Sequence, residues 1–307
     1  MTLEPCCHQG RTPPCTELLL EKRPARVVIG SRDPNPLVAG KSVAILRAAG
    51  IDVERDVLRE ECDRLNPIFF HYIVHRTPYI ALKYAMTADG RIACHTGQSR
   101  WVSNELSRGH VHSLRHRYRG VMVGVGTVLA DDPRLNCRRP QASRDPVRII
   151  CDSRLRLPPD CQIVRTAREQ PTIVACAAAP DKRRQALERA GVEVLPLPGR
   201  DGRVDLTALL AELGRREIDG VLVEGGAELN AALLEQRLVH RLYCYIAPKL
   251  FGGQTAKAPV GGRGAATPDK ALRLQPPQID RLGDDVLLTY DVAATDQDGG
   301  ETACLPE

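Results

Sequence analysis

Short apolar runs alternate with amphipathic segments from residue 77 to residue 293, and this alternation limits the fold more than any other feature of the chain. Runs that are almost continuously apolar are typical of central strands whose two faces are both covered. The expected strands are residues 79–84, 120–125, 147–151, 172–176, 192–195, 220–223, 241–246 and 286–290. The expected helices are residues 103–118, 182–190, 206–215 and 227–237. This region therefore predicts an α/β fold.

A separate block, residues 1–75, precedes this region and opens with a cysteine-rich loop. Its expected elements are a helix at 16–22, a strand at 25–30, a helix at 41–49 that ends before Gly50, a strand at 51–53 and a helix at 58–71. Residues 294–307 are polar. The sequence thus predicts two domains, 1–75 and 77–293, and a polar tail at 294–307.

The composition of the 307 residues excludes several classes of protein. Hydrophobic residues make up 43% and charged residues 26%, which is typical of a globular chain and not of a disordered one. The longest apolar run, residues 120–130, is too short to span a membrane and contains three glycines, so we expect a buried strand and turn there. A net charge of +5 suits an anionic small molecule, and an aromatic content of 4% does not favour a nucleic-acid binder.

Eleven cysteines are present, and no basic and apolar leader follows Met1. We therefore expect a reducing, cytoplasmic setting in which most cysteines are small buried hydrophobes. We expect neither a nucleic acid nor a membrane as a partner.

The N-terminal loop carries half of a zinc deaminase pattern. In that chemistry zinc lowers the pKa of a bound water, and a Glu beside a His ligand moves the proton. Here Pro5-Cys6 matches the start of the second motif, and Pro14-Cys15 supplies the second cysteine after eight intervening residues. With Asp33-Pro34-Asn35-Pro36, this stretch resembles the bifunctional deaminase/reductase family of riboflavin biosynthesis. The resemblance implies that Cys6 and Cys15 are zinc ligands in a partial cytidine-deaminase-like domain.

The first half of the zinc pattern is missing, because none of the eight histidines has a Glu two residues later. The third ligand and the proton carrier are therefore not identified, and the zinc site is expected to be incomplete. Three alternatives remain: Cys6 and Cys15 are free thiols, they form a partial non-catalytic zinc site with a residue such as His8, or an upstream segment absent from this sequence completes the deaminase.

The region from Pro78 to Arg138 carries the stronger pattern. A predicted strand includes Lys83, and the segments Asp89-Gly90-Arg91, Gly97 to Trp101 and Gly126 to Pro133 follow in order. Their order and spacing resemble the reductase half of the same family, over nearly all of residues 77–293. The resemblance implies a dihydrofolate-reductase-like fold and NADPH as the cofactor.

Two turns in this region suit ligands on physical grounds. Gly126 permits a sharp turn after an apolar strand, and Asp131-Asp132-Pro133 then supplies paired carboxylates, although a plain surface turn has the same pattern. Glu224-Gly225-Gly226 joins a strand to a helix, and free N–H groups at a helix N-terminus suit a phosphate. This is not a G-x-G-x-x-G fingerprint, and a tight turn without a ligand is the alternative.

The resemblance assigns roles to individual residues. We expect Lys83 and Asp131 to be the catalytic polar groups, and the remaining roles are those that the resemblance implies. The substrate-binding residues would be Ser99, Arg115, Leu135, Arg138 and Glu224. The cofactor-binding residues would be Ala85, Trp101, Thr127, Asp131, Ser153, Gly226, Ala227, Glu228, Leu229 and Asn230. Alternatives remain open for three of these residues: Lys83 is a surface lysine at a strand end, Arg115 lies on a solvated helix face, or Trp101 fills the core.

The expected function is NADPH-dependent reduction of 5-amino-6-(5-phosphoribosylamino)uracil to the 5-phosphoribitylamino compound. The first alternative is a full bifunctional enzyme that also deaminates 2,5-diamino-6-(5-phosphoribosylamino)pyrimidin-4-one with zinc. The second is a non-catalytic nucleotide-binding homologue. The expected partner is a phosphorylated aminopyrimidine, and the family implies a homo-oligomer.

Overall fold

The computed structural model describes residues 1–10, 12–140 and 143–293, and the expected tail at 294–307 lies outside them. The chain divides into two compact units. One comprises Met1–Tyr79 and Leu210–Asp219, and the other comprises Ile80–Leu209 and the described residues from Gly220 onward. Each unit has its own hydrophobic core. No helix among the described residues is long and apolar enough to cross a membrane.

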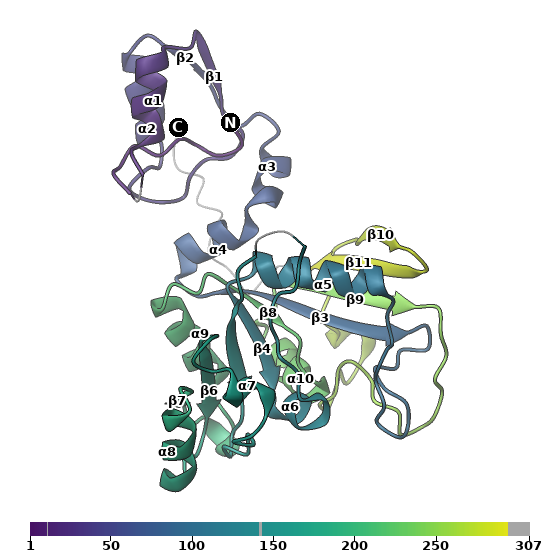
Figure 1. Ribbon diagram of the computed structural model, residues 1–307. Helices are drawn as coiled ribbons and strands as arrows, with labels where there is room; N and C mark the ends of the chain where they lie inside the picture. Colours follow the sequence, from purple (N-terminus) through teal and green to yellow (C-terminus); the bar gives the residue numbers. More distant parts are fainter. Residues whose placement is uncertain (11, 141–142, 294–307) are drawn as a thin grey trace. The chain divides into compact units, whose positions relative to one another are not determined.

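The first unit is built around a two-stranded parallel sheet, drawn in purple and blue in Figure 1. Its strands are β1 (Arg26–Val28) and β2 (Asp52–Glu54), and in each strand only the middle residue is buried. Its helices are α1 (Cys15–Lys22), α2 (Lys41–Ala48), α3 (Arg59–Leu65) and α4 (Pro67–His75). The core consists of Val27, Ile29, Val43, Leu46, Ile51 and Val53.

One helix prediction in this unit is wrong. Residues 58–71 do not form a single helix, because α3 ends at Leu65 and α4 begins at Pro67. Proline has no N–H group to donate, and its ring clashes with the carbonyl four residues earlier, so it is tolerated in the first turn of a helix and not in its interior.

The second unit contains a nine-stranded sheet with the order β10-β11-β9-β3-β8-β4-β5-β6-β7 (Figure 1). β10 and β9 run antiparallel to β11, whereas β3 is parallel to β9, and β8, β4, β5, β6 and β7 pair in parallel. The strands are β3 (Tyr79–Thr87), β4 (Gly120–Gly124), β5 (Val147–Cys151), β6 (Thr172–Cys176), β7 (Glu193–Pro196), β8 (Gly220–Val223), β9 (Arg241–Ala247), β10 (Gln278–Leu282) and β11 (Asp285–Asp291). The expected strands correspond to β3 to β9 and β11, and β10 is an addition at the sheet edge.

The helices that follow these strands are α5 (Glu105–Arg117), α6 (Val125–Asp131), α7 (Gln162–Arg165), α8 (Asp181–Arg189), α9 (Leu206–Arg215) and α10 (Ala227–Glu235). Two short 3-10 helices lie at Arg200–Gly202 and Pro268–Lys270. Asn104 caps the start of α5, because its side chain accepts a hydrogen bond from the Ser107 N–H at 2.9 Å. The side chain of His110 on α5 reaches Tyr245 on β9, which places this helix against the sheet.

The prediction of a strand and turn over residues 120–130 is only half right. β4 covers its first part, but Val125–Asp131 form the helix α6. The buried residues Val125 and Val128 of α6 lie in the same core as Val121 and Val123 of β4. An apolar run does not by itself distinguish a strand from a buried helical turn, and packing decided between them here.

Candidate active site

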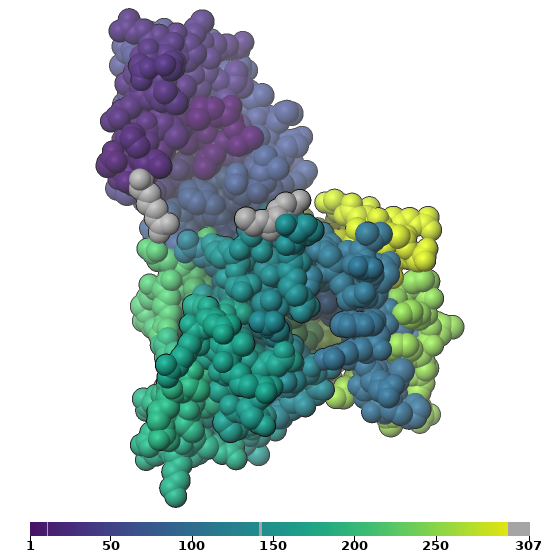
Figure 2. Space-filling view, viewed as in Figure 1, coloured from purple at the N-terminus to yellow at the C-terminus, as the bar shows by residue number. Residues whose placement is uncertain are grey.

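A cavity of about 960 Å³ opens in the second unit. It lies where β4 and β8 end and the first turns of α6 and α10 begin, and β3, α5 and the loop after α6 complete its wall. Figure 2 shows this unit hollowed between its blue and teal segments. A volume of this size suits a cofactor or a small ligand, and the carboxyl ends of parallel strands are the usual place for such a site.

Three charged side chains from separate elements share one part of the wall: Lys83 of β3, Arg115 of α5 and Glu224 at the end of β8. Arg115 donates from Nε to Oε1 of Glu224 at 2.6 Å and from a terminal nitrogen to Oε2 at 3.0 Å. Both side chains are only 12% exposed, so this is a buried, two-point ion pair. The alternative that Arg115 lies on a solvated helix face is therefore wrong.

The electrostatics of this cluster follow from burial and from the three charges. Burial lowers the pKa of Lys83; Glu224 acts in the opposite direction, and Arg115 adds to the lowering. Burial alone would raise the pKa of Glu224, but Arg115 and then Lys83 outweigh it, and the pKa is lowered. Glu224 therefore stays ionised, and the Lys83 amine can release a proton more readily than a free lysine does.

The sequence suggested that Lys83 lies at the end of its strand, but it does not. β3 continues to Thr87, so Lys83 lies inside the strand and faces the cavity, with its Nζ 5.5 Å from the centre of the Tyr245 ring. A surface lysine is thereby excluded.

The turn from β8 to α10 brings backbone close to the cavity. Gly225 is closely packed: a Cβ there would lie 2.9 Å from Cδ2 of Leu229 and 3.1 Å from Oδ1 of Asn230, so a side chain would require these neighbours to shift. Gly226 precedes α10, and no side chain caps this helix. The first N–H groups of α10 are consequently not bonded within the helix, as an anion-binding turn requires.

Asp131 lies at the C-terminal end of α6 and lines the cavity with Thr127 of the same helix. Its Oδ1 accepts a hydrogen bond from the Ser99 hydroxyl at 3.4 Å. The segment that contains Ser99 also carries Trp101, which is 61% exposed. The alternative that Trp101 fills the core is wrong, because its ring stands at the cavity wall with the Arg108 guanidinium 4.7 Å from its centre.

Most of the sequence-predicted site residues thus meet in one place. The cavity wall includes Lys83, Ala85, Ser99, Trp101, Arg115, Thr127, Asp131, Leu135, Arg138, Glu224, Gly226, Ala227, Glu228 and Leu229. Ser153 and Asn230 lie outside this wall. The Ser153 hydroxyl accepts from the Val204 N–H at 3.3 Å, and the Asn230 amide donates to the Pro259 carbonyl at 2.8 Å.

Sequence reasoning missed several residues of the wall, above all His112 and Asn136. His112 precedes Arg115 by three residues on α5, and residues three or four apart share one face of a helix. That spacing was the available signal. Asn136 lies in a loop without periodicity, so no sequence signal marked it as a site residue.

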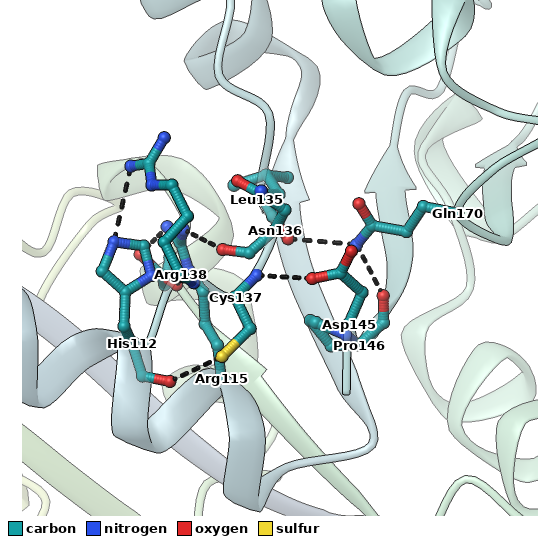
Figure 3. Close-up of polar contacts among 10 residues, drawn as sticks. His112, Arg115, Leu135, Asn136, Cys137, Arg138, Asp145, Pro146 and Gln170 are labelled. Carbon is teal, nitrogen blue, oxygen red and sulfur yellow. Dashed lines mark hydrogen bonds and ion pairs between the residues drawn. The ribbon is translucent and has the colours of Figure 1, made fainter. Parts of the chain in front are cut away.

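The loop that carries Asn136 is held by four hydrogen bonds, two to α5 and two to Asp145 and Gln170 (Figure 3). Arg115 donates to the Asn136 carbonyl at 2.9 Å, and the Cys137 thiol donates to the His112 carbonyl at 3.2 Å. The Cys137 N–H donates to Asp145 at 2.7 Å, and the buried Gln170 amide donates to the Leu135 carbonyl at 3.2 Å. The loop that forms this part of the cavity wall is therefore held by α5 on one side and by Asp145 and Gln170 on the other.

The two cysteines of the first unit are close together. The Cys15 N–H donates to the Cys6 sulfur at 3.2 Å, and a hydrogen bond with Cys6, followed by burial, raises the pKa of the Cys15 thiol. No group of three or more His, Cys, Asp or Glu residues able to hold a metal ion is found in residues 1–10, 12–140 and 143–293. Two sulfurs alone do not make the four-ligand or three-ligand set that zinc requires, so the residues present do not fit the metal.

Comparison with known proteins identifies the family. The model of the RibD C-terminal domain matches residues 78–288. The riboflavin biosynthesis protein RibD of Actinobacillus pleuropneumoniae is 52% identical over 290 residues, which cover 94% of this chain and 77% of that protein. The chain belongs to the RibD family. It therefore carries the reductase domain of that family, and it is an oxidoreductase of riboflavin biosynthesis.

Solved structures extend the likeness to the fold. A deaminase/5-amino-6-(5-phosphoribosylamino)uracil reductase from Thermotoga maritima superposes with a TM-score of 0.80 at 33% identity, over 95% of this chain and 78% of that one. A riboflavin biosynthesis reductase from Saccharomyces cerevisiae, at 26% identity and a TM-score of 0.57, covers 71% of this chain and 91% of its own. The expected α/β fold of RibD is confirmed, and a non-catalytic homologue is not favoured.

Proposed function

We propose that this RibD chain reduces 5-amino-6-(5-phosphoribosylamino)uracil to its 5-phosphoribitylamino product with NADPH. The observation that carries the proposal is the convergence of Lys83, Arg115 and Glu224 on one wall of a cavity whose other walls include the N-terminal turn of α10. Such a cavity offers a proton source, a fixed carboxylate and a phosphate-binding turn in one place.

The residues present fit the proposed cofactor. The uncapped first turn of α10, with Gly226 ahead of it, suits the pyrophosphate, and Thr127 and Asp131 offer a hydroxyl and a carboxylate to the sugar hydroxyls. Trp101 presents an exposed ring at the wall, where an aromatic surface suits a nicotinamide. When bound, NADPH supplies the hydride for the reduction.

The chemistry left to the protein is orientation and proton transfer. In the ring-opened sugar, C1′ is double-bonded to nitrogen; hydride addition at C1′ breaks that π bond, and the nitrogen takes up a proton. Lys83 is assigned as the donor of that proton, since burial lowers its pKa and favours release. Glu224 and Arg115 hold the substrate side of the cavity, and Asp131 with Ser99 orients the cofactor side.

The proposal is tested by following NADPH oxidation when the deaminated pyrimidine phosphate is added. Lys83→Met keeps most of the side-chain volume but removes the amine, so kcat should fall about 10²- to 10⁴-fold. Lys182→Met on α8, where the lysine is exposed and away from the cavity, is the matched control and should keep the wild-type rate. No oxidation of NADPH by the wild-type chain would refute the function, and normal turnover in the Lys83 variant would refute the role of Lys83.

A further inference from the structure

The imidazole of His112 is approached by hydrogen-bond donors on both of its nitrogens (Figure 3). The backbone N–H of Arg138 donates to Nδ1 at 3.2 Å. A terminal nitrogen of the Arg138 guanidinium lies 3.4 Å from Nε2. Both His112 and Arg138 line the cavity.

A neutral imidazole has only one acceptor nitrogen, so these two contacts cannot both be hydrogen bonds. The backbone contact involves a loop that is held by two hydrogen bonds to α5 and two to Asp145 and Gln170, whereas the guanidinium belongs to an exposed side chain. Nδ1 is therefore the acceptor, and the proton is on Nε2. The Nε2–H group and the Arg138 guanidinium are then two neighbouring donors that need a shared acceptor.

The charges around His112 favour the same protonation state. Burial lowers the pKa of His112, and the cations Arg115 on its own helix and Arg138 on the loop lower it further. Glu224 at the end of β8 and the backbone of Asn136 act in the opposite direction but do not outweigh them. The ring is accordingly neutral at pH 7, with one N–H to donate.

Arg115 is less free than Arg138 to bind an anion of the ligand. Its guanidinium already makes two bonds to Glu224 and one to the Asn136 carbonyl. The positive charge of Arg115 is thus largely balanced by a buried carboxylate, and the unbalanced donors on this side of the cavity are those of His112 and Arg138.

We propose that the Nε2–H of His112 binds the phosphate monoester at the sugar end of the substrate, beside the guanidinium of Arg138, which the family resemblance already assigns to the substrate. This assignment rests on the proposed function and adds His112 to its site. A phosphate monoester is the chemistry that fits, because it offers several acceptor oxygens and a negative charge to an N–H donor and a planar guanidinium side by side. His112 here is a binding residue and takes no part in proton transfer.

The test measures binding of ribose 5-phosphate to the cofactor-free protein by calorimetry, with ribose as the uncharged comparison. His112→Ala should weaken ribose 5-phosphate binding about 10- to 100-fold, which is the effect of losing one hydrogen bond to a charged group, and should leave ribose binding unchanged. His112→Gln retains an N–H donor and should recover most of the affinity. Arg138→Ala removes an exposed side chain that the fold does not need, and it should show a loss at least as large.

His116→Ala is the matched control. His116 lies one turn further along α5, and its Nδ1 also accepts a backbone N–H, that of Arg144 at 3.2 Å, but it is outside the cavity wall. Its removal should leave ribose 5-phosphate binding unchanged. Nitrogen NMR of the His112 ring should show the proton on Nε2 and a shift of that resonance on addition of ribose 5-phosphate but not of ribose.

The outcomes separate this inference from the proposed function. If ribose 5-phosphate binding depends on His112 and Arg138 while the wild-type chain does not oxidise NADPH, the phosphate site stands and the reductase reaction fails. If the wild-type chain reduces the substrate but His112→Ala and Arg138→Ala bind ribose 5-phosphate normally, the reaction stands and this phosphate site is overturned. A proton found on Nδ1 would also overturn it.

Discussion

The first unit carries its candidate ligands, Cys6 and Cys15, on one short loop, whereas the second unit draws Lys83, Arg115 and Glu224 from three elements that are far apart in the chain. The loop presents two sulfurs and gathers no third metal-binding group within the described residues. The nine-stranded sheet brings distant side chains to one cavity, pairs them and partly buries them. A local sequence motif is therefore weaker evidence of an active site than a cavity in which the fold brings side chains from several elements together.

The largest expected effect tests whether the pairing in the second unit is essential. Glu224→Ala leaves Arg115 buried without its carboxylate, and breaking such a pair costs about 3–5 kcal/mol of unfolding free energy. Urea denaturation measures this cost, and NADPH oxidation should also be lost. The double variant Arg115→Met/Glu224→Leu should be less destabilised than the single variant, because no charge remains unpaired. Equal stability of Glu224→Ala and wild type would show that the pair is not the support that its geometry indicates.

A smaller effect is expected at Asp131, elsewhere on the cavity wall. Asp131→Ala removes the carboxylate that Ser99 contacts and should lower kcat/KM for reduction about 10²-fold, the lower end of what a positioned polar group contributes. Ser99→Ala removes only the partner and should have a weaker effect. Steady-state kinetics with NADPH and the pyrimidine phosphate measures both, and wild-type turnover in Asp131→Ala would remove this residue from the site.

The smallest effect is expected in the first unit, where we predict no deaminase activity, in contrast to the reductase activity proposed for the second unit. Without an identified acid/base group beside Cys6 and Cys15, zinc should produce no measurable ammonia from 2,5-diamino-6-(5-phosphoribosylamino)pyrimidin-4-one. The rate of NADPH oxidation should be the same with added zinc and with a chelator. Cys6→Ser is the control and should change neither readout. Zinc-dependent ammonia release that is lost in Cys6→Ser would break the comparison, since the loop would then be a working site.

Three elements were not predicted correctly from the sequence. β10 was not predicted because its residues are mostly exposed and include Gln278, Asp280 and Arg281, so no apolar run marks it. The helix at 58–71 was predicted without regard to Pro67, although proline gave the signal for a break. The helix α6 had no such signal, since its apolar residues continue the run of β4.

The sequence by itself determined the α/β class, the positions of eight strands and the motifs of the RibD family, because burial of a strand is recorded locally in its apolar residues. Only the tertiary structure decided what the charged residues do. Arg115 and Glu224 are 109 positions apart, and nothing local to either predicts that they pair. The lowered pKa of Lys83 and the single proton of the His112 ring likewise depend on neighbours from other elements. Desolvation and hydrogen bonding are properties of the assembled cavity, and for that reason the reactive state of these side chains could not be derived from their place in the sequence.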